Sequence, residues 1–148
     1  MSTIYSIALQ NYIAATGSLR AAINNCNIDI YSGPVPANCE AAVTGSNTLL
    51  VTINNGGTPG TFSATPTNGV LSKTSAETWS GTIANSGTAT FFRLHVPASD
   101  SDSGAADSSD AFYRIQGAVG TDVTSEMVLP STTLTSGNTQ TINLFQLD

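Results

Sequence analysis

The chain has 148 residues, a net charge of −6, and charged side chains at only 9% of its positions, against roughly 25% in an ordinary soluble domain. This length suits one domain with a real core. The four basic residues do not cluster, which excludes nucleic acid as a partner because phosphate binding needs a basic patch. The acidic balance also disfavours an anionic membrane surface, and no apolar run approaches the roughly 18 residues of a membrane span.

The composition favours an all-β domain. The chain contains 21 Thr, 18 Ser and 13 Gly; threonine favours strands, whereas glycine and serine favour turns. The first residues, Met-Ser-Thr-Ile-Tyr-Ser, lack the basic start of a signal peptide. We therefore expect the protein to be made and kept in the cytosol, or to leave it by lysis.

Residues 2–16 are predicted to form a helix, with Ser2 as N-cap and Gly17 as a left-handed stop. Ser18 can cap a second, short helix over residues 19–23. The apolar face of the first helix is too wide for a lone surface helix. It consists of Ile4, Tyr5, Ile7, Ala8, Leu9, Tyr12 and Ile13.

This helical segment must bury its apolar face somewhere. It packs either on the sheet of its own chain or, as a terminal arm, on a neighbouring subunit. We accordingly divide the chain into an N-terminal helical arm, residues 1–25, and a single β body, residues 26–148.

Alternating apolar residues predict the first strand at 27–33, which the pair Gly33-Pro34 ends. A second strand is expected at 48–53, followed by a tight turn at 54–57, where Asn and Gly tolerate positive φ. Phe62 is expected to pin the next loop to the core, ahead of a short strand at 70–72.

Two longer strands are predicted in the central part of the chain, at 77–83 and 88–96. Because only one turn separates them, we expect them to pair with each other in antiparallel fashion. Trp79 is either a core residue or an exposed platform that stacks on a ligand.

The next segment, 97–110, is predicted to be a solvated loop. It contains four aspartates and resembles a calcium-binding loop, but lacks the third acid, the correctly placed glycine and the terminal glutamate. Further strands are expected at 111–117, 127–129 and 141–147, with a turn or bulge at 117–120. The economical arrangement is two packed antiparallel sheets, as in a β-sandwich or jelly roll.

No residue of the sequence indicates a catalytic chemistry. His95 is the single histidine, and we expect a structural role for it. Cys26 and Cys39, with the distant His95, are too few for a zinc site; we expect free, partly buried thiols, a disulfide being the alternative. Nucleophile-elbow, phosphate-loop, dinucleotide and zinc-protease motifs are absent. The sequence therefore predicts a non-enzymatic protein that needs no cofactor and no metal.

Arg93 and Arg114 each follow two aromatic residues in a predicted strand. Such a guanidinium either pairs within the chain, with Asp29 or Glu77, or lies on a ring. The alternative is that both arginines anchor an interface with a partner, where arginine and aromatic residues concentrate.

Several short runs of the sequence carry a resemblance that spans most of the chain. They are Leu19–Pro36 with its Ile28–Gly33 core, Leu49-Leu50, Glu77–Gly81, Phe92-Arg93, Arg114–Gly117 and Gln140–Ile142. With these runs the chain resembles small structural proteins of tailed bacteriophages. Jelly-roll cement (decoration) proteins of phage heads are the most similar in size, β content and acidity, although the helical N-terminus departs from a simple sandwich.

The resemblance implies a virion component on the outer capsid surface, assembled in the host cytoplasm. Its partners would be the major capsid protein and further copies of itself, in a homodimer or homotrimer. The expected interface residues are Ile4, Ile7, Leu9, Tyr12, Ile13, Arg93 and Arg114. The alternatives are a tail or fibre subunit and a carbohydrate-binding β-sandwich with Trp79 or Tyr113 as its platform.

Overall fold

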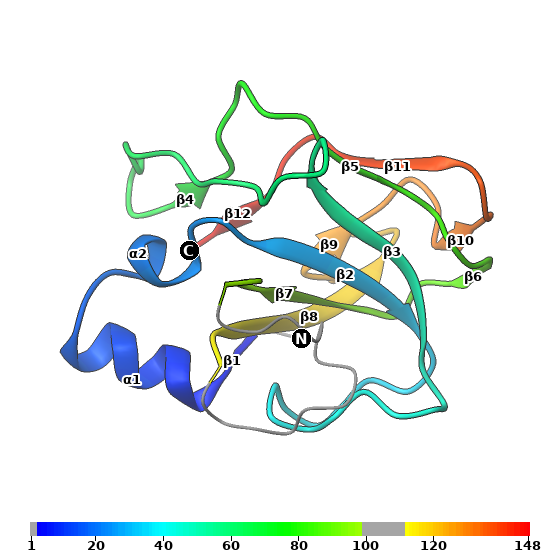
Figure 1. Ribbon diagram of the computed structural model, residues 1–148, viewed down its shortest axis with the longest axis horizontal. Coiled ribbons are helices and arrows are strands. Elements are labelled where there is room, and N and C mark those ends of the chain that lie inside the picture. The colour runs from blue at the N-terminus through cyan, green and yellow to red at the C-terminus, as the bar shows by residue number, and fades with distance from the viewer. Residues whose placement is uncertain (1–2, 99–111) are drawn as a thin grey trace.

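The computed structural model describes residues 3–98 and 112–148. Within them the chain forms an antiparallel β-sandwich with two short helices near its N-terminus (Figure 1). The elements are β1 (Ile4–Tyr5), α1 (Ile7–Ala15), α2 (Leu19–Ile23), β2 (Asn27–Ser32), β3 (Thr48–Asn55), β4 (Leu71–Ser72), β5 (Trp79–Thr82), β6 (Gly87–Thr88), β7 (Phe91–His95), β8 (Arg114–Gly120), β9 (Met127–Val128), β10 (Thr133–Leu134), β11 (Thr139–Ile142) and β12 (Gln146–Leu147).

The main sheet has the strand order β1-β8-β7-β2-β3-β5-β11, and β9 also pairs with β8. All of these pairs are antiparallel except β8–β9, which is parallel. Two small sheets, β6–β10 and β4–β12, complete the two layers. The prediction of an all-β antiparallel sandwich with a short helical N-terminus is therefore confirmed.

The sheet turns from one layer to the other within β3. The register between β2 and β3 shifts after Ile30, which leaves Leu50 as the extra residue of a bulge. Beyond the bulge, residues 51–53 of β3 still pair with β2, and the end of β3, at Asn54 and Asn55, pairs with β5. The close crossing needs a glycine, because a Cβ on Gly81 would lie 2.1 Å from the carbonyl oxygen of Thr52.

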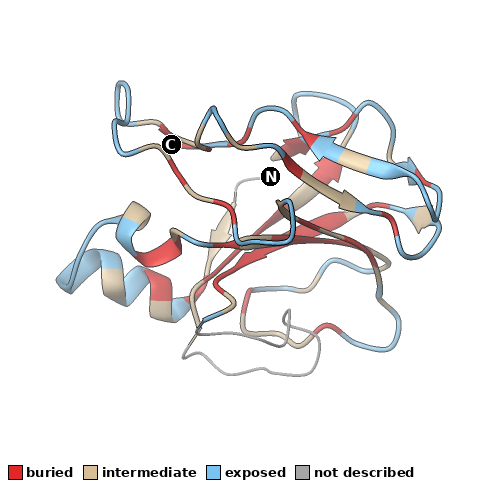
Figure 2. Cartoon of the chain, turned by 45° about the horizontal axis from the view of Figure 1, so that its top comes forward, coloured by how far each residue is buried: buried red, intermediate tan, exposed pale blue. Residues whose placement is uncertain are grey.

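Aromatic residues fill the space between the layers. Figure 2 shows that the central strands are buried and that many of the loops around them are exposed. Trp79 is fully buried and packs edge-on against Phe62, with their ring centroids 5.5 Å apart. Its indole nitrogen donates to Glu77 Oε2 at 2.7 Å. The core role predicted for Trp79 and the anchoring role predicted for Phe62 are confirmed.

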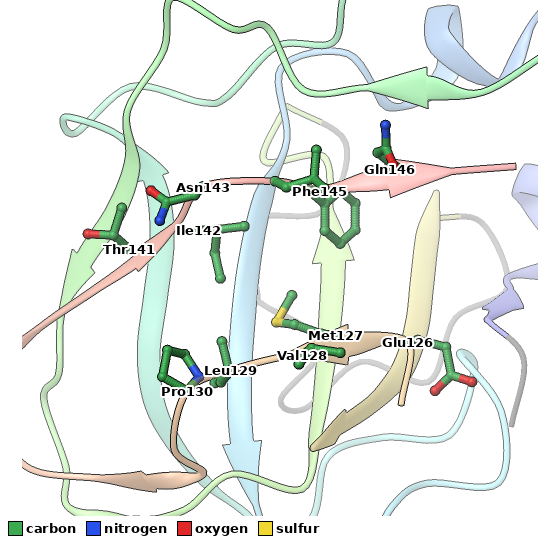
Figure 3. Close-up of a pocket in the computed structure, with 11 residues that line it drawn as sticks. Glu126, Met127, Val128, Leu129, Pro130, Thr141, Ile142, Asn143, Phe145 and Gln146 are labelled. Atoms are coloured by element: carbon green, nitrogen blue, oxygen red, sulfur yellow. The ribbon is translucent and has the colours of Figure 1, made fainter. Parts of the chain in front are cut away.

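Segment 126–130, which contains β9, and segment 141–146, at the end of β11, face each other at one side of the sandwich. In Figure 3 the side chains of Ile142 and Phe145 point toward those of Met127 and Leu129 across a cavity. All four side chains are buried, so the two segments close the core at this side.

One predicted strand pairing is wrong. β5 pairs with β3 and β11, whereas β7 pairs with β2 and β8. After β5 the chain continues along other segments, because Ile83 N–H donates to Asn138 O and Ala84 N–H to Leu50 O, both at 2.8 Å. The expected turn at 117–120 is also wrong, since β8 runs on to Gly120.

The first helix is shorter than predicted. Its N-cap is Ser6, which accepts a hydrogen bond from Leu9 N–H, rather than Ser2. Ile4 and Tyr5 are instead paired with Gln116 and Ile115 of β8. Gly17 does not take a left-handed conformation; a Cβ there would lie 2.8 Å from the hydroxyl oxygen of Tyr12 and 2.9 Å from its ring. The second helix and its Ser18 cap lie where they were predicted.

Candidate functional site

One face of the β2–β7–β8 layer is polar and nevertheless buried. Its side chains alternate with the apolar residues that face the core, as the period of a strand requires. Asp29 of β2 stands opposite Arg93 of β7, which stands opposite Gln116 of β8. All three side chains are fully buried, so this polar layer depends on partners inside the protein.

The arginines of this layer hold the loop at 34–47 onto the sheet. Arg93 donates through Nη2 to the carbonyl oxygens of Asn38 (3.0 Å) and Ala41 (2.5 Å), and through Nε to Gln116 Oε1 (2.9 Å). Arg114 Nη1 donates to the carbonyl oxygen of Cys39 at 3.1 Å. Carbonyl oxygens on a loop are good acceptors for a guanidinium, which carries five donors in a fixed fork.

This burial corrects the expectation that Arg93 and Arg114 anchor an interface. Neither side chain is exposed on the folded chain, so no partner reaches either of them without unfolding the loop that covers them. The sequence places each arginine correctly on its strand face, but the loop that buries this face lies more than 50 residues away in the chain.

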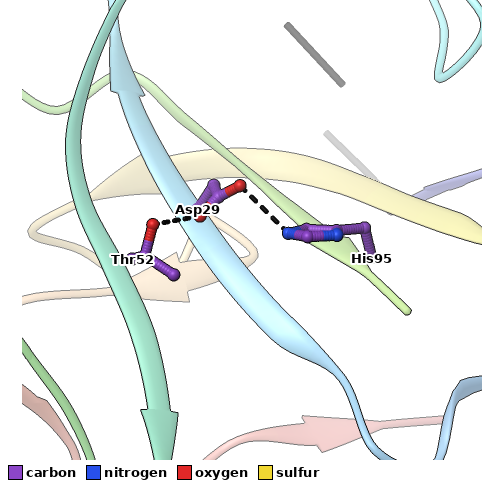
Figure 4. Close-up of polar contacts among 3 residues, drawn as sticks. All are labelled: Asp29, Thr52 and His95. Atoms are coloured by element: carbon purple, nitrogen blue, oxygen red, sulfur yellow. Dashed lines mark hydrogen bonds and ion pairs between the residues drawn. The ribbon is translucent and has the colours of Figure 1, made fainter. Parts of the chain in front are cut away.

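Asp29 also contacts the single histidine (Figure 4). Its Oδ2 lies 3.0 Å from His95 Nε2, and its Oδ1 accepts a hydrogen bond from Thr52 Oγ1 at 2.6 Å. The arrangement contains the histidine–carboxyl half of a catalytic triad. However, the hydroxyl of Thr52 donates to the carboxyl group rather than to the imidazole, so Thr52 is not activated as a nucleophile.

The two cysteines are free and buried, as predicted. Burial raises the pKa of Cys39 to about 12, and it raises the pKa of Cys26 as well. Cys39 Sγ donates to the carbonyl oxygen of Ile4 at 3.1 Å. The reactive form of cysteine is the thiolate, so neither thiol is poised as a nucleophile near neutral pH.

Metal-ligating side chains do not gather in the part of the chain that the structure describes: no group of three or more His, Cys, Asp or Glu residues could hold an ion there. The four aspartates considered for calcium, at positions 100, 102, 107 and 110, lie outside the described residues. Neither α1 nor α2 has the length and apolar run of a membrane-crossing helix.

No protein-family model, no curated protein and no solved structure matches this chain.

The N-terminal helix is anchored through two residues and carries two exposed isoleucines. Leu9 is fully buried, and the ring of Tyr12 packs on Tyr113 with centroids 5.3 Å apart. Ile7 and Ile13 are 47% and 38% exposed; they lie about 120° apart around the helix, with the exposed Gln10 between them. Figure 2 shows α1 at the end of the body with much of its surface exposed. Of the predicted interface residues, Ile7 and Ile13 therefore face outward.

Two further exposed apolar residues are not among the predicted interface residues. Val128 and Leu144 are 51% and 69% exposed, and both line the cavity between 126–130 and 141–146. Both lie in segments predicted as strands, where period alone does not tell an exposed edge from a buried centre. In the sequence, Pro130 and Asn143 were the residues that could have indicated an early end of these two strands.

Proposed function

We propose that this protein is a non-enzymatic virion structural protein, a capsid cement protein that binds adjacent major capsid subunits on the outer surface of the particle. The observation that carries the proposal is the exposure of two large apolar side chains on α1, Ile7 at 47% and Ile13 at 38%. Apolar residues at a chain end that leave water on contact with a neighbour favour association.

The character of the remaining surface supports the same proposal. Charged residues make up 9% of the chain, while Thr and Ser dominate its polar residues. Removing charges from water on binding is costly unless they are well paired, so a surface of hydroxyl and amide groups is easier to cover. The polar groups that resemble catalytic ones are committed to internal contacts instead.

The decisive measurement is binding to assembled shells. The purified protein should bind expanded capsids in many copies per particle and should not bind free capsid subunits. A few copies per particle would instead indicate the tail or fibre subunit. Homodimers or homotrimers in solution, measured by light scattering, are the expected oligomeric states.

The role of α1 is tested with Ile7→Asp combined with Ile13→Asp, which should weaken shell binding at least tenfold. The matched control is Val35→Asp, because Val35 is 41% exposed and lies outside the helix. Removing residues 1–17 is a poorer test, since Ser6 Oγ donates to Phe112 O at 2.7 Å and accepts from Arg114 N–H at 3.0 Å. Unchanged binding by the double variant would contradict the proposal.

A further inference from the structure

The cavity between β9 and β11 has the form of a groove bounded by two extended segments, which we call the edge groove. Its volume is about 440 Å³, and residues 126–130 and 141–146 line it. In Figure 3 the two segments run in opposite directions, one on each side. Buried apolar side chains form its floor and exposed ones its rim: Met127, Leu129, Ile142 and Phe145 below, Val128 and Leu144 above.

On one side of the edge groove, main-chain groups of β9 point outward. β9 pairs with β8 in parallel register, and Leu129 N–H donates to Gly120 O at 2.9 Å. In a parallel ladder, a residue whose neighbours bond to the partner strand directs its own N–H and C=O to the opposite side. The N–H and C=O of Val128 therefore point away from β8, and Val128 lines the edge groove.

The other side of the groove presents the open edge of β11. Ile83 N–H donates to Asn138 O at 2.8 Å. Because bonded pairs alternate in an antiparallel ladder, Ile142 carries a ladder bond to Trp79, and Thr141, one step before it, turns its N–H and C=O away from β5. Within residues 3–98 and 112–148, β11 pairs with β5 alone, and Thr141 lines the edge groove.

Two open strand edges thus flank an apolar floor. From this geometry we infer that the edge groove binds an extended peptide segment of a partner protein, which adds a strand between β9 and the 141–146 segment. Main-chain hydrogen bonds to Val128 and Thr141 supply the pairing, as at other exposed sheet edges. Every second side chain of the added strand points to the floor, so the ligand alternates apolar with polar residues.

Charge further defines the partner. Glu126 is the one charged residue that lines the edge groove, and the whole chain carries −6. An acidic strand would be repelled, whereas a neutral or basic one fits. This inference does not rest on the virion role, since strand addition requires only the groove.

The probe is a displayed library of random octapeptides, selected on the full-length protein. Enriched sequences should alternate apolar and polar residues and be depleted in Asp and Glu. The most enriched peptide is then synthesised twice, once unmodified and once N-methylated at alternate amides, which keeps every side chain but removes main-chain donors. The N-methylated form should bind at least tenfold more weakly. Amide exchange at Val128 and Thr141 should slow when the unmodified peptide is saturating.

Variants on the rim locate the binding. Val128→Asp combined with Leu144→Asp should weaken binding at least tenfold, and because both side chains are exposed the fold should be kept, which an unchanged thermal midpoint verifies. The control is Val123→Asp, since Val123 is 94% exposed and does not line the groove. If the double variant unfolds at a lower temperature than the wild type, the amide exchange of the wild-type protein with the peptide still tests whether the edge groove binds it.

Three results would overturn the inference. They are no enrichment of peptides, equal affinity of the N-methylated form, and equal loss of binding in the Val123 control and the rim variant. Concentration-dependent self-association that only the rim variant abolishes would also overturn it, because the occupant would then be a second copy of this chain.

Discussion

Asp29 and His95 contact each other diagonally across the β2–β7 pair. In the register of these strands His95 stands opposite Asn27 and Asp29 opposite Arg93, yet Asp29 Oδ2 lies 3.0 Å from His95 Nε2. Diagonal neighbours on one sheet face are within reach of long side chains. The contact joins two central strands on a face that is polar and buried.

We predict that Asp29→Ala destabilises the protein by about 3 kcal/mol, because it leaves a buried imidazole and the Thr52 hydroxyl without this partner. Thr52→Val is the matched comparison: it removes one donor at nearly constant volume and should cost about 1 kcal/mol. Urea unfolding measures both. An Asp29→Ala protein as stable as the wild type would contradict a structural role for the pair.

A second prediction concerns Glu77 and acid. Burial alone would raise the pKa of Glu77, but hydrogen bonds from the Thr61 hydroxyl, the Thr61 amide and the Trp79 indole, with Lys73 nearby, hold that pKa below its ordinary value. A carboxyl group with a lowered folded pKa stabilises the protein above its unfolded pKa, and this stabilisation is lost as the pH falls through the folded pKa.

The free energy of unfolding of wild type and Glu77→Gln should therefore differ most above pH 4.5, the ordinary value for this group, and converge below it. Near neutral pH we expect a loss of about 1–2 kcal/mol, because the amide accepts fewer of the hydrogen bonds. Urea titrations between pH 3 and pH 7, at roughly unit steps, measure the difference. A difference that is constant over this range would count against the assigned role.

A third prediction tests whether Arg93 holds the 34–47 loop. Arg93→Lys keeps the charge but loses the fork that reaches Asn38 O, Ala41 O and Gln116 Oε1 together. We expect a loss of about 2 kcal/mol and faster proteolysis within the loop. Arg20→Lys is the control, because within the described residues the Arg20 side chain donates one hydrogen bond, from Nε to Phe62 O. Equal effects of the two changes would refute the role of Arg93.

Local features of this fold are readable from the sequence. The second helix follows from Ser18 and the apolar spacing after it, and the turn at 54–57 follows from residues that accept positive φ, as Gly56 and Gly57 do. In both cases the determining residues are adjacent in the chain. The central position of Trp79 was likewise expected from its size.

The strand order and the polar layer were not predictable, because each depends on distant segments. Adjacency suggested that β5 pairs with β7, yet the bulge at Leu50 and the glycine at Gly81 carry β5 to the other layer. Arg93 was placed on the correct strand face, but whether that face is exposed depends on the loop at 34–47. No local pattern encodes such a loop's position.

The last prediction concerns this crossing of β3 and β5. A Cβ at Gly81 would lie 2.1 Å from Thr52 O and 2.9 Å from a methyl carbon of Val51, and a main-chain oxygen in a paired strand cannot move far. Gly81→Ala should therefore destabilise the protein by about 3 kcal/mol, within the range of overpacked cores. At Gly45 a Cβ meets nothing within 4 Å and φ is not positive, so Gly45→Ala should change stability by less than about 1 kcal/mol. Thermal unfolding of the two variants compares them directly. Equal thermal midpoints of Gly81→Ala and Gly45→Ala would mean that β3 and β5 do not cross as closely as the structure places them. The turn of the sheet at β3 would then need another explanation.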